Sequence, residues 1–207
     1  MTAPLEHAAA AGILTAGGVL ILGTDTLPGF HCRADATDGV RRIQALKGRA
    51  ATKPLLLLAG SLEQALTVAG PLDAHQAALC DRCWPGPFSL ILPARPLVHP
   101  LVTAQGATVA VRVPDLEALR SLVRDAGCPL VSTSVNREGT PPSVTLPEAV
   151  AAFGDDVDGW WDPLAEEGAD VDHHRQSASA LVDLMVWPPR VIRAGPRPLP
   201  GGLSGLS

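Results

Sequence analysis

Four short stretches of this sequence place cations, hydroxyls and amides directly beside apolar runs. They cover residues 23–26, 47–54, 110–114 and 132–136. Each neighbouring apolar run is typical of a buried strand or a helix, and open α/β sheets assemble ligand sites where their strands end. Lys47, Arg49 and Lys53 crowd three cations into one predicted loop, which suits a polyanion such as a nucleoside triphosphate better than it suits a core.

The same stretches also have plainer interpretations, which the sequence leaves open. Taken alone, the three cations are explained by a solvated loop. Arg112 lies between valines on a predicted strand, so it needs an anion, and a structural ion pair serves as well as a bound carboxylate. The run 132–136, with three hydroxyls and an amide, can form a simple turn or bind ligand oxygens. Asp25 can hold a loop or bind Mg²⁺ through water.

Composition narrows the class of protein. The 207 residues are 46% hydrophobic, enough for one domain, and the core must be aliphatic because there are only four Trp, three Phe and no Tyr. A formal charge of −5 disfavours tight non-specific binding to nucleic acid. No apolar run is as long as a membrane span, no signal-peptide pattern begins the chain, and the four cysteines lack zinc-site spacing. We therefore expect a reduced, cytoplasmic protein without a metal site of its own.

Helices and strands alternate along most of the chain, which predicts an α/β fold. Apolar runs predict strands over residues 19–22, 30–33, 54–59, 88–92, 108–113, 129–134, 178–186 and 191–193. Caps and amphipathic patterns predict helices over 4–16, 38–46, 73–83, 116–126 and 146–153, with another beginning at Ser61. No helix is predicted between strands 88–92 and 108–113, so we expect mixed pairing. Segments 155–176 and 194–207 are predicted to be loosely structured.

Six motifs occur in a consistent order across most of the chain. They are Thr-Asp-Thr at 24–26, Lys-Gly-Arg at 47–49, the run 84–92, the run 108–115, the run 133–139, and 179–183 followed by 192–195. Together they resemble the YrdC-like family of threonylcarbamoyl-AMP synthases. The resemblance implies an α/β domain over residues 5–195, in which a twisted sheet of mixed parallel and antiparallel strands, flanked by helices, surrounds a large basic cavity. Residues 196–207 are then a Pro/Gly-rich tail.

The resemblance also implies a reaction. L-threonine, bicarbonate and ATP give threonylcarbamoyl-adenylate and pyrophosphate, with Mg²⁺ accompanying ATP. A tRNA-modifying transferase complex then accepts the adenylate and modifies tRNA beside the anticodon.

The residues that carry this reaction follow from the resemblance position by position. The implied ATP contacts are Arg49, Lys53, Thr108, Asn136, Ser143 and Arg193. The implied L-threonine contacts are Thr26, Arg112, Ser134 and Ser179. The residues expected to be catalytic are Lys47, Arg49, Ser134 and Asn136. They would act by positioning the substrates and neutralising charge, because this chemistry requires no side-chain nucleophile.

Some positions depart from the family pattern, and other functions are compatible with the fold. Pro28 stands where an aromatic residue is common, Lys53 where Asn is common and Leu58 where His is common, so the identity of the amino acid stays open. One alternative is a double-stranded RNA-binding or ribosome-assembly module, which would bind RNA weakly because the sequence pI is near 5.6. Another is an enzyme like the related domain of hydrogenase-maturation carbamoyltransferases, whose zinc-finger and acylphosphatase modules this sequence lacks.

Overall fold

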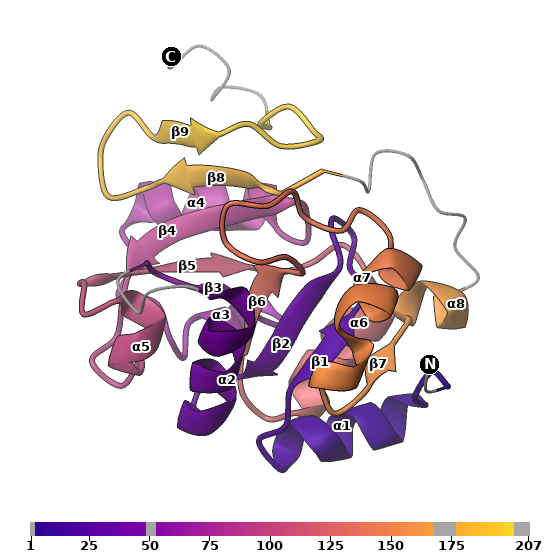
Figure 1. The fold of residues 1–207 in the computed structure, drawn as a ribbon. Coiled ribbons are helices and arrows are strands. Elements are labelled where there is room, and N and C mark those ends of the chain that lie inside the picture. The colour runs from indigo at the N-terminus through magenta and orange to yellow at the C-terminus, as the bar shows by residue number, and fades with distance from the viewer. Residues whose placement is uncertain (1–2, 49–52, 168–176, 201–207) are drawn as a thin grey trace.

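Nine strands form one mixed sheet in the part of the chain that the computed structural model describes, residues 3–48, 53–167 and 177–200. Their order is β7-β1-β2-β6-β3-β5-β4-β8-β9 (Figure 1). The strands are β1 Leu20–Leu22, β2 Gly29–Arg33, β3 Leu56–Leu58, β4 Phe88–Pro93, β5 Thr108–Arg112, β6 Leu130–Ser134, β7 Trp160–Trp161, β8 Ala180–Asp183 and β9 Arg190–Arg193. The pairs β1–β7, β3–β5 and β4–β8 are parallel and the others are antiparallel, which confirms the predicted mixed sheet.

Helices lie on both sides of this sheet (Figure 1). They are α1 His7–Thr15, α2 Thr37–Lys47, α3 Leu62–Ala65, α4 Ala74–Cys83, α5 Pro100–Thr103, α6 Glu117–Asp125, α7 Leu146–Phe153 and α8 Pro163–Glu167, with a 3₁₀ turn, η1, at Gly154–Asp156. Local sequence sets several of their ends. Capping boxes begin α4 at Asp73 and α7 at Thr145, and α2 stops at Gly48, whose φ of +60° favours glycine.

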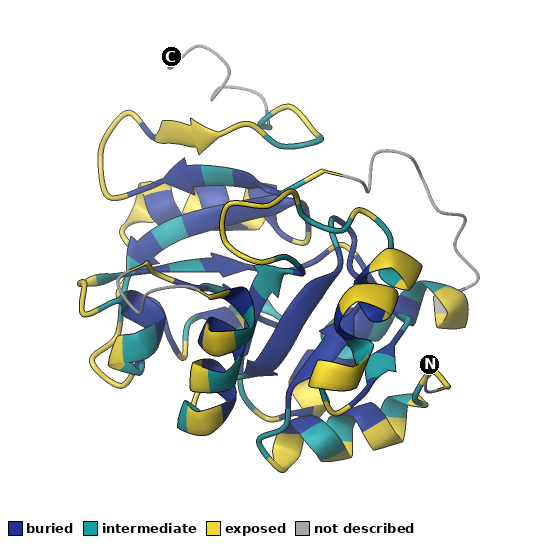
Figure 2. Ribbon diagram, in the orientation of Figure 1, coloured by how far each residue is buried: buried dark blue, intermediate teal, exposed yellow. Residues whose placement is uncertain are grey.

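One face of the sheet is packed mainly with apolar side chains. Six register partners form a continuous buried row across six strands: Cys32, Val131, Leu57, Val111, Leu90 and Val182. Residues of α2, α4, α5 and α7 pack on this face in the same core cluster. The central strands are accordingly mostly dark blue in Figure 2, whereas the outer sides of these helices and the edge strand β9 are yellow. This core holds the sheet rigid behind the opposite face.

The opposite face is divided between a second core and polar residues. Leu20 and Leu22 of β1, with Leu58 and Leu130 in the middle of the sheet, pack under α1 and α6. Polar residues share this face: Ser132 and Ser134 follow Leu130 on β6, and Arg112 of β5 is the register partner of Leu58 on β3. Because alternate residues of a strand share a face, these polar side chains stand beside the second core on one surface.

Two sequence predictions about the elements were wrong. Segment 155–176 was predicted to be loosely structured, yet its described part contains η1, β7 and α8. Strand β7 is only two residues long and pairs in parallel with β1, so it offered no alternating pattern to detect. The connection between β4 and β5 was predicted to lack a helix, but it contains the single turn α5. That turn does not reverse the pairing, because β4 and β5 are antiparallel.

None of the described helices is long and apolar enough to cross a bilayer. The predicted boundary between a domain over 5–195 and a tail over 196–207 stays a prediction, and residues 201–207 lie outside the described part of the chain.

Candidate functional site

A pocket of about 630 Å³, the central pocket, lies on the polar part of the second face. Its walls are alternate residues of neighbouring strands, such as Ala110 and Arg112 of β5, Ser132 and Ser134 of β6, and Ser89 of β4. Its volume lies within the range of small-molecule sites. The sequence placed the candidate residues at strand ends. The structure instead distributes them along a sheet face as well as at ends, because a mixed sheet has no single edge where all its strands terminate.

The structure brings most of the predicted site residues to this pocket. Those that line it are Thr26, Lys47, Lys53, Thr108, Arg112, Ser134, Asn136, Ser179 and Arg193. Ser143 does not line it; its backbone N–H donates to the Val135 carbonyl at 3.0 Å, and its neighbour Pro142 is the residue at the wall. Arg49 lies outside the described residues.

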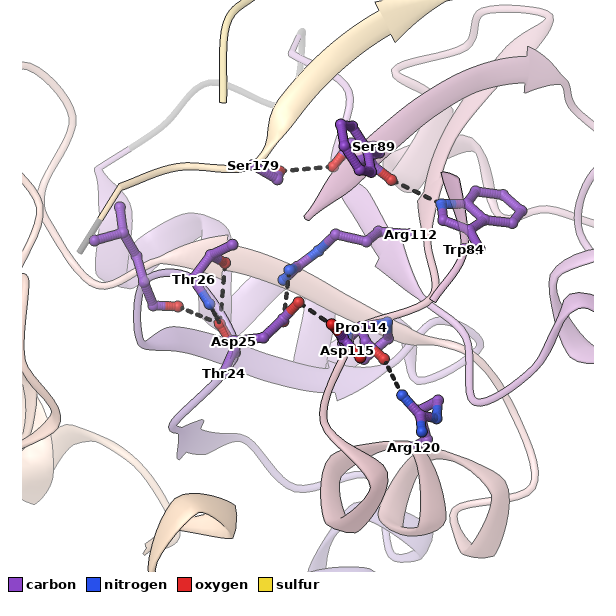
Figure 3. A network of polar contacts seen from close by, with 12 residues as sticks. Thr24, Asp25, Thr26, Trp84, Ser89, Arg112, Pro114, Asp115, Arg120 and Ser179 are labelled. Carbon is purple, nitrogen blue, oxygen red and sulfur yellow. Dashed lines mark hydrogen bonds and ion pairs between the residues drawn. The ribbon is translucent and has the colours of Figure 1, made fainter. Parts of the chain in front are cut away.

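Arg112 and Asp25 form an ion pair at the base of the pocket (Figure 3). Arg112 Nη1 donates to Asp25 Oδ1 at 2.7 Å, and the two side chains are only 2% and 5% exposed. The second carboxylate oxygen of Asp25 accepts the backbone N–H of Asp115 at 2.9 Å. Asp25 therefore holds the loop and orients Arg112. Arg112 still lines the pocket, and its Nε has no hydrogen-bond partner, so the guanidinium has donors beyond those that Asp25 takes.

The loop around Asp25 is fixed by its flanking threonines. Thr24 Oγ1 donates to the Leu27 carbonyl at 2.8 Å and accepts the Thr26 backbone N–H at 3.0 Å. These two bonds close a tight turn, which Figure 3 shows beside Arg112. The turn presents Thr26 to the pocket and keeps the Asp25 carboxylate directed at the guanidinium.

The sequence placed Lys47 in a loop, for which a solvated loop was one interpretation. In the structure Lys47 is instead the last residue of α2. It follows Val40 and Ile43 at helical spacing, so it lies on the buried side of the helix and is only 5% exposed. Its ammonium group donates to the Ser134 carbonyl at 2.7 Å and to the carbonyl and side-chain oxygens of Asn136 at 3.2 and 2.8 Å. Lys47 therefore fastens the end of β6 to the end of α2.

Asn136 and Ser134 are locked together at that point. Ser134 Oγ donates to Asn136 Oδ1 at 2.7 Å, which orients the amide so that Nδ2 donates to the carbonyls of Arg137 and Thr140 at 3.0 and 2.8 Å. The predicted turn and the predicted pocket lining are thus both present in the same residues. The loop after β6 is rigid because a lysine, a serine and an amide bind one another.

Glu138 and Ser89 line the pocket and were not singled out from the sequence. Glu138 forms an ion pair with Lys53 at the rim. Ser89 Oγ lies 2.8 Å from Ser179 Oγ, and Arg193 Nε donates to the Ser179 carbonyl at 3.0 Å. Ser89 could have been found, because strict alternation along 88–92 puts it on the face opposite Phe88 and Leu90.

Burial shifts the pKa values of an arginine at the pocket and of three cysteines in the core. Burial lowers the pKa of Arg193, and the nearby Arg112 charge lowers it further. Burial raises the pKa of Cys32 and Cys80 to about 12 and that of Cys83 to about 11, so these thiols stay protonated and are poor nucleophiles. Among the described residues no group of three or more His, Cys, Asp or Glu side chains could hold a metal ion.

Comparison with known proteins identifies the relatives of this chain. The Sua5/YciO/YrdC family, described as "Telomere recombination", matches residues 12–195. The threonylcarbamoyl-AMP synthase of Chromohalobacter salexigens is 37% identical over 148 residues, which are 72% of this chain and 80% of that protein. The threonylcarbamoyl-AMP synthase of Bacillus subtilis is 37% identical over 155 residues, 74% of this chain and 44% of that protein.

Solved structures share the fold of this chain. P. abyssi Sua5 complexed with L-threonine matches with a TM-score of 0.81 and 28% identity over 93% of this chain and 56% of that one. E. coli YciO shares the fold, with a TM-score of 0.78 and 21% identity over 91% of this chain and 88% of that one. The chain thus spans about half the length of the B. subtilis and P. abyssi proteins. It spans most of the length of the C. salexigens synthase and of E. coli YciO. With a match over residues 12–195 in sequence and a corresponding fold, this chain belongs to the Sua5/YciO/YrdC family.

Proposed function

We propose that this chain is an L-threonylcarbamoyladenylate synthase, which makes threonylcarbamoyl-AMP and pyrophosphate from L-threonine, bicarbonate and ATP. The observation that carries the proposal is the central pocket, where one cavity unites four cationic side chains with hydroxyls from several strands. The names of the relatives from C. salexigens and B. subtilis, and the bound L-threonine of P. abyssi Sua5, support the choice of reaction.

L-threonine occupies the part of the pocket around Arg112. The substrate carboxylate accepts hydrogen bonds from the N–H groups of Arg112 that do not bind Asp25. A guanidinium can donate two parallel hydrogen bonds, which suits a carboxylate. Thr26, Ser134 and Ser179 line the same cavity and offer hydroxyls to the amine and to the substrate hydroxyl. Because Asp25 has already neutralised Arg112, the site favours a zwitterion over a ligand of high net charge.

ATP occupies the side of the pocket near Lys53, Thr108 and Arg193. Arg49, which lies outside the described residues, is a further ATP contact that the resemblance implies. Lysine and arginine side chains there neutralise the phosphates. The rigid loop of Ser134 and Asn136, held by Lys47, forms the wall against which the phosphates are positioned. Lys47 therefore contributes by fixing this wall, a role that differs from direct contact through a flexible loop.

The reaction needs two bond-forming steps between aligned substrates. The threonine amine attacks the carbon of bicarbonate, a nitrogen–carbon bond forms, and water leaves, which gives a carbamate. A carbamate oxygen then attacks the α-phosphorus, an oxygen–phosphorus bond forms, and pyrophosphate leaves with the electron pair of the broken bond. Alignment and charge neutralisation lower both barriers, and the chain's cations and hydroxyls supply both.

Mg²⁺ bound to the triphosphate would neutralise part of the phosphate charge. Glu138, a carboxylate in the described lining of the pocket that pairs with Lys53, would be the side chain to hold this ion. The product then passes to a tRNA-modifying transferase complex in the cytoplasm, which transfers the threonylcarbamoyl group to tRNA.

Pyrophosphate release tests the proposal. Purified protein is incubated with ATP, Mg²⁺ and bicarbonate, and each amino acid is added in turn. Release should require ATP and bicarbonate and should be fastest with L-threonine. Arg193→Ala should abolish it, whereas Arg41→Ala, which removes an arginine from an exposed ion pair with Asp38, should not change it. Absence of release with every amino acid, together with salt-dependent RNA binding, would favour the RNA-binding alternative.

A further inference from the structure

One row of side chains crosses four strands at one end of the central pocket. Ser89 of β4 pairs with Leu181 of β8, and Leu181 pairs with Arg193 of β9. The antiparallel register of β4 with β5, continued by one residue, sets Ser89 opposite Arg112. Register partners share a face of a sheet, and all four residues line the pocket. A serine and a leucine therefore lie between two guanidinium groups.

The serine of this row has a second serine beside it. Ser89 and Ser179 are 1% and 4% exposed, and their hydroxyl oxygens lie 2.8 Å apart (Figure 3). Each hydroxyl carries one hydrogen, and the bond between them uses one of the two. The other hydrogen has no acceptor among the described residues. A buried donor of this kind is costly to leave unbonded, so it indicates a ligand oxygen at this point of the wall.

The charges around the two serines favour an anion. Arg112 has a carboxylate partner in Asp25. In the described part of the chain Arg193 bonds only uncharged oxygens, the Ser179 carbonyl at 3.0 Å and, at 3.5 Å, the Ser179 hydroxyl. The pKa of Arg193 is lowered first by burial and then by the Arg112 charge, which shows that the two cations repel each other. A small oxyanion beside Ser179 would relieve that repulsion.

The position of this donor set identifies which oxyanion it takes, and this step rests on the proposed function. Arg112 holds the amino-acid carboxylate and Arg193 the nucleotide, so Ser179, which touches Arg193, lies at the junction of the two substrate sites. Bicarbonate must lie at that junction, because its carbon meets the amine and its oxygen later meets the α-phosphorus. We infer that Ser89, Ser179 and Arg193 form the bicarbonate subsite, with Ser89 as a binding residue for that substrate.

The variant Ser89→Ala tests the inference. It removes one of the two hydroxyls, so the KM for bicarbonate should rise about tenfold, as expected for a lost hydrogen bond to a charged group. The KM values for ATP and L-threonine should change little. Ser89→Thr, which keeps the hydroxyl, should restore most of the bicarbonate affinity, and Ser121→Ala, on α6 and outside the pocket lining, is the matched control.

A binding measurement separates this inference from the proposed function. Labelled bicarbonate is titrated into the protein with L-threonine and a non-hydrolysable ATP analogue and is followed by carbon NMR. Saturable binding to wild type and to Ser89→Thr, with weaker binding to Ser89→Ala, supports the subsite even if pyrophosphate release fails. Equal bicarbonate affinity in wild type and in a folded Ser89→Ala overturns the subsite, even if the wild-type protein releases pyrophosphate.

Discussion

At the scale of single residues, the buried pair of Arg112 and Asp25 links substrate binding to stability. The free-energy cost of burying a guanidinium and a carboxylate is offset because the two groups form an ion pair with each other. Asp25 also accepts a hydrogen bond from the backbone N–H of Asp115. The residue proposed to bind the threonine carboxylate is therefore also part of the structure that holds the loop. Its replacement has two separate consequences, which different measurements detect.

Arg112→Ala should raise the KM for L-threonine and also reduce the free energy of unfolding by about 3–5 kcal/mol, because it leaves the Asp25 charge buried without a partner. Urea denaturation measures the second effect. The double variant Arg112→Ala/Asp25→Asn, which removes the orphaned charge, should recover part of the stability but none of the threonine affinity. Equal free energies of unfolding for wild type and Arg112→Ala would show that the ion pair does not stabilise the fold.

Lys47→Met should destabilise the protein by about 1–3 kcal/mol and raise the KM values of both substrates, since the carbonyls of Ser134 and Asn136 lose the ammonium donor and Asn136 Oδ1 keeps only the Ser134 hydroxyl. Lys53→Met is the matched comparison, because Lys53 is 60% exposed at the rim. That variant should raise the KM for ATP with almost no change in stability. Thermal melting and initial rates of the two variants test the distinction, and indistinguishable melting temperatures would contradict the role given to Lys47.

The sequence was informative about which residues gather at the site and less so about how each one is used. Thr26, Arg112 and Ser134 were found because hydroxyls and cations are uncommon beside buried strands, whereas Arg193 was implied by the resemblance to the YrdC-like family. The sequence allowed two roles for Asp25 and two for Arg112. Only the ion pair between them decides which role each residue has. The inward direction of Lys47 depends on where α2 ends, and the ends of helices are the least certain part of a pattern-based prediction.

At the scale of elements, those with a long pattern, a cap or a continuous apolar run were predicted, including the short strands β1 and β3, and others such as β7 and α5 were missed. Strand β4 and helices α4 and α6 have several turns or alternations, or a cap, to identify them. Strand β7 has two residues and α5 one turn, so neither contains a full period of any pattern. Both are stabilised by neighbours distant in sequence, as the pairing of β7 with β1 shows.

The close approach of the segment after β9 to the start of β8 gives an element-scale prediction. A Cβ added to Gly195 would lie 2.3 Å from the Ala180 backbone nitrogen, so Gly195→Ala must separate the two segments. Ser179 and Arg193 lie directly beside them, and we expect a higher KM for ATP and a lower melting temperature. Gly12→Ala on α1 meets nothing within 4 Å and should instead stabilise the protein by about 0.5–1 kcal/mol. An active, stable Gly195→Ala variant would contradict the tight packing.

At the scale of the whole molecule, the twisted sheet has a closed apolar face and a face shared between a second core and the central pocket. Composition indicated one aliphatic domain, but not that the pocket would lie on a sheet face. That placement depends on strand order, which brings β2 and β6 between β1 and β3, and no local pattern records strand order.

His31 couples global stability to pH. It is fully buried beside Ser132, neither ring nitrogen has a hydrogen-bond partner, and burial lowers its pKa to about 3. The unfolded chain, in which histidine titrates near its ordinary pKa of about 6.5, binds a proton more readily, so stability is full above that pH and falls as pH drops towards 3.

The free energy of unfolding of wild type, measured by urea denaturation, should therefore decline between pH 6.5 and 4.5, by up to about 1.4 kcal/mol per pH unit. His31→Leu should decline less over the same interval, whatever its stability at neutral pH. Carboxylates such as Asp35, whose pKa is lowered mainly by its hydrogen bond with Arg33, are common to both proteins and cancel in the comparison. Parallel curves for the two proteins would rule out the buried neutral histidine.

The central claim is that one pocket aligns L-threonine, bicarbonate and ATP so that all three contribute atoms to a single product. Mass spectrometry of a reaction with isotopically labelled bicarbonate tests it most directly. We expect a threonylcarbamoyl-adenylate that carries the label, is formed by wild type and by Arg41→Ala, and is absent with Arg193→Ala. An adenylate without the label, or the labelled product at an undiminished rate from Arg193→Ala, would contradict it.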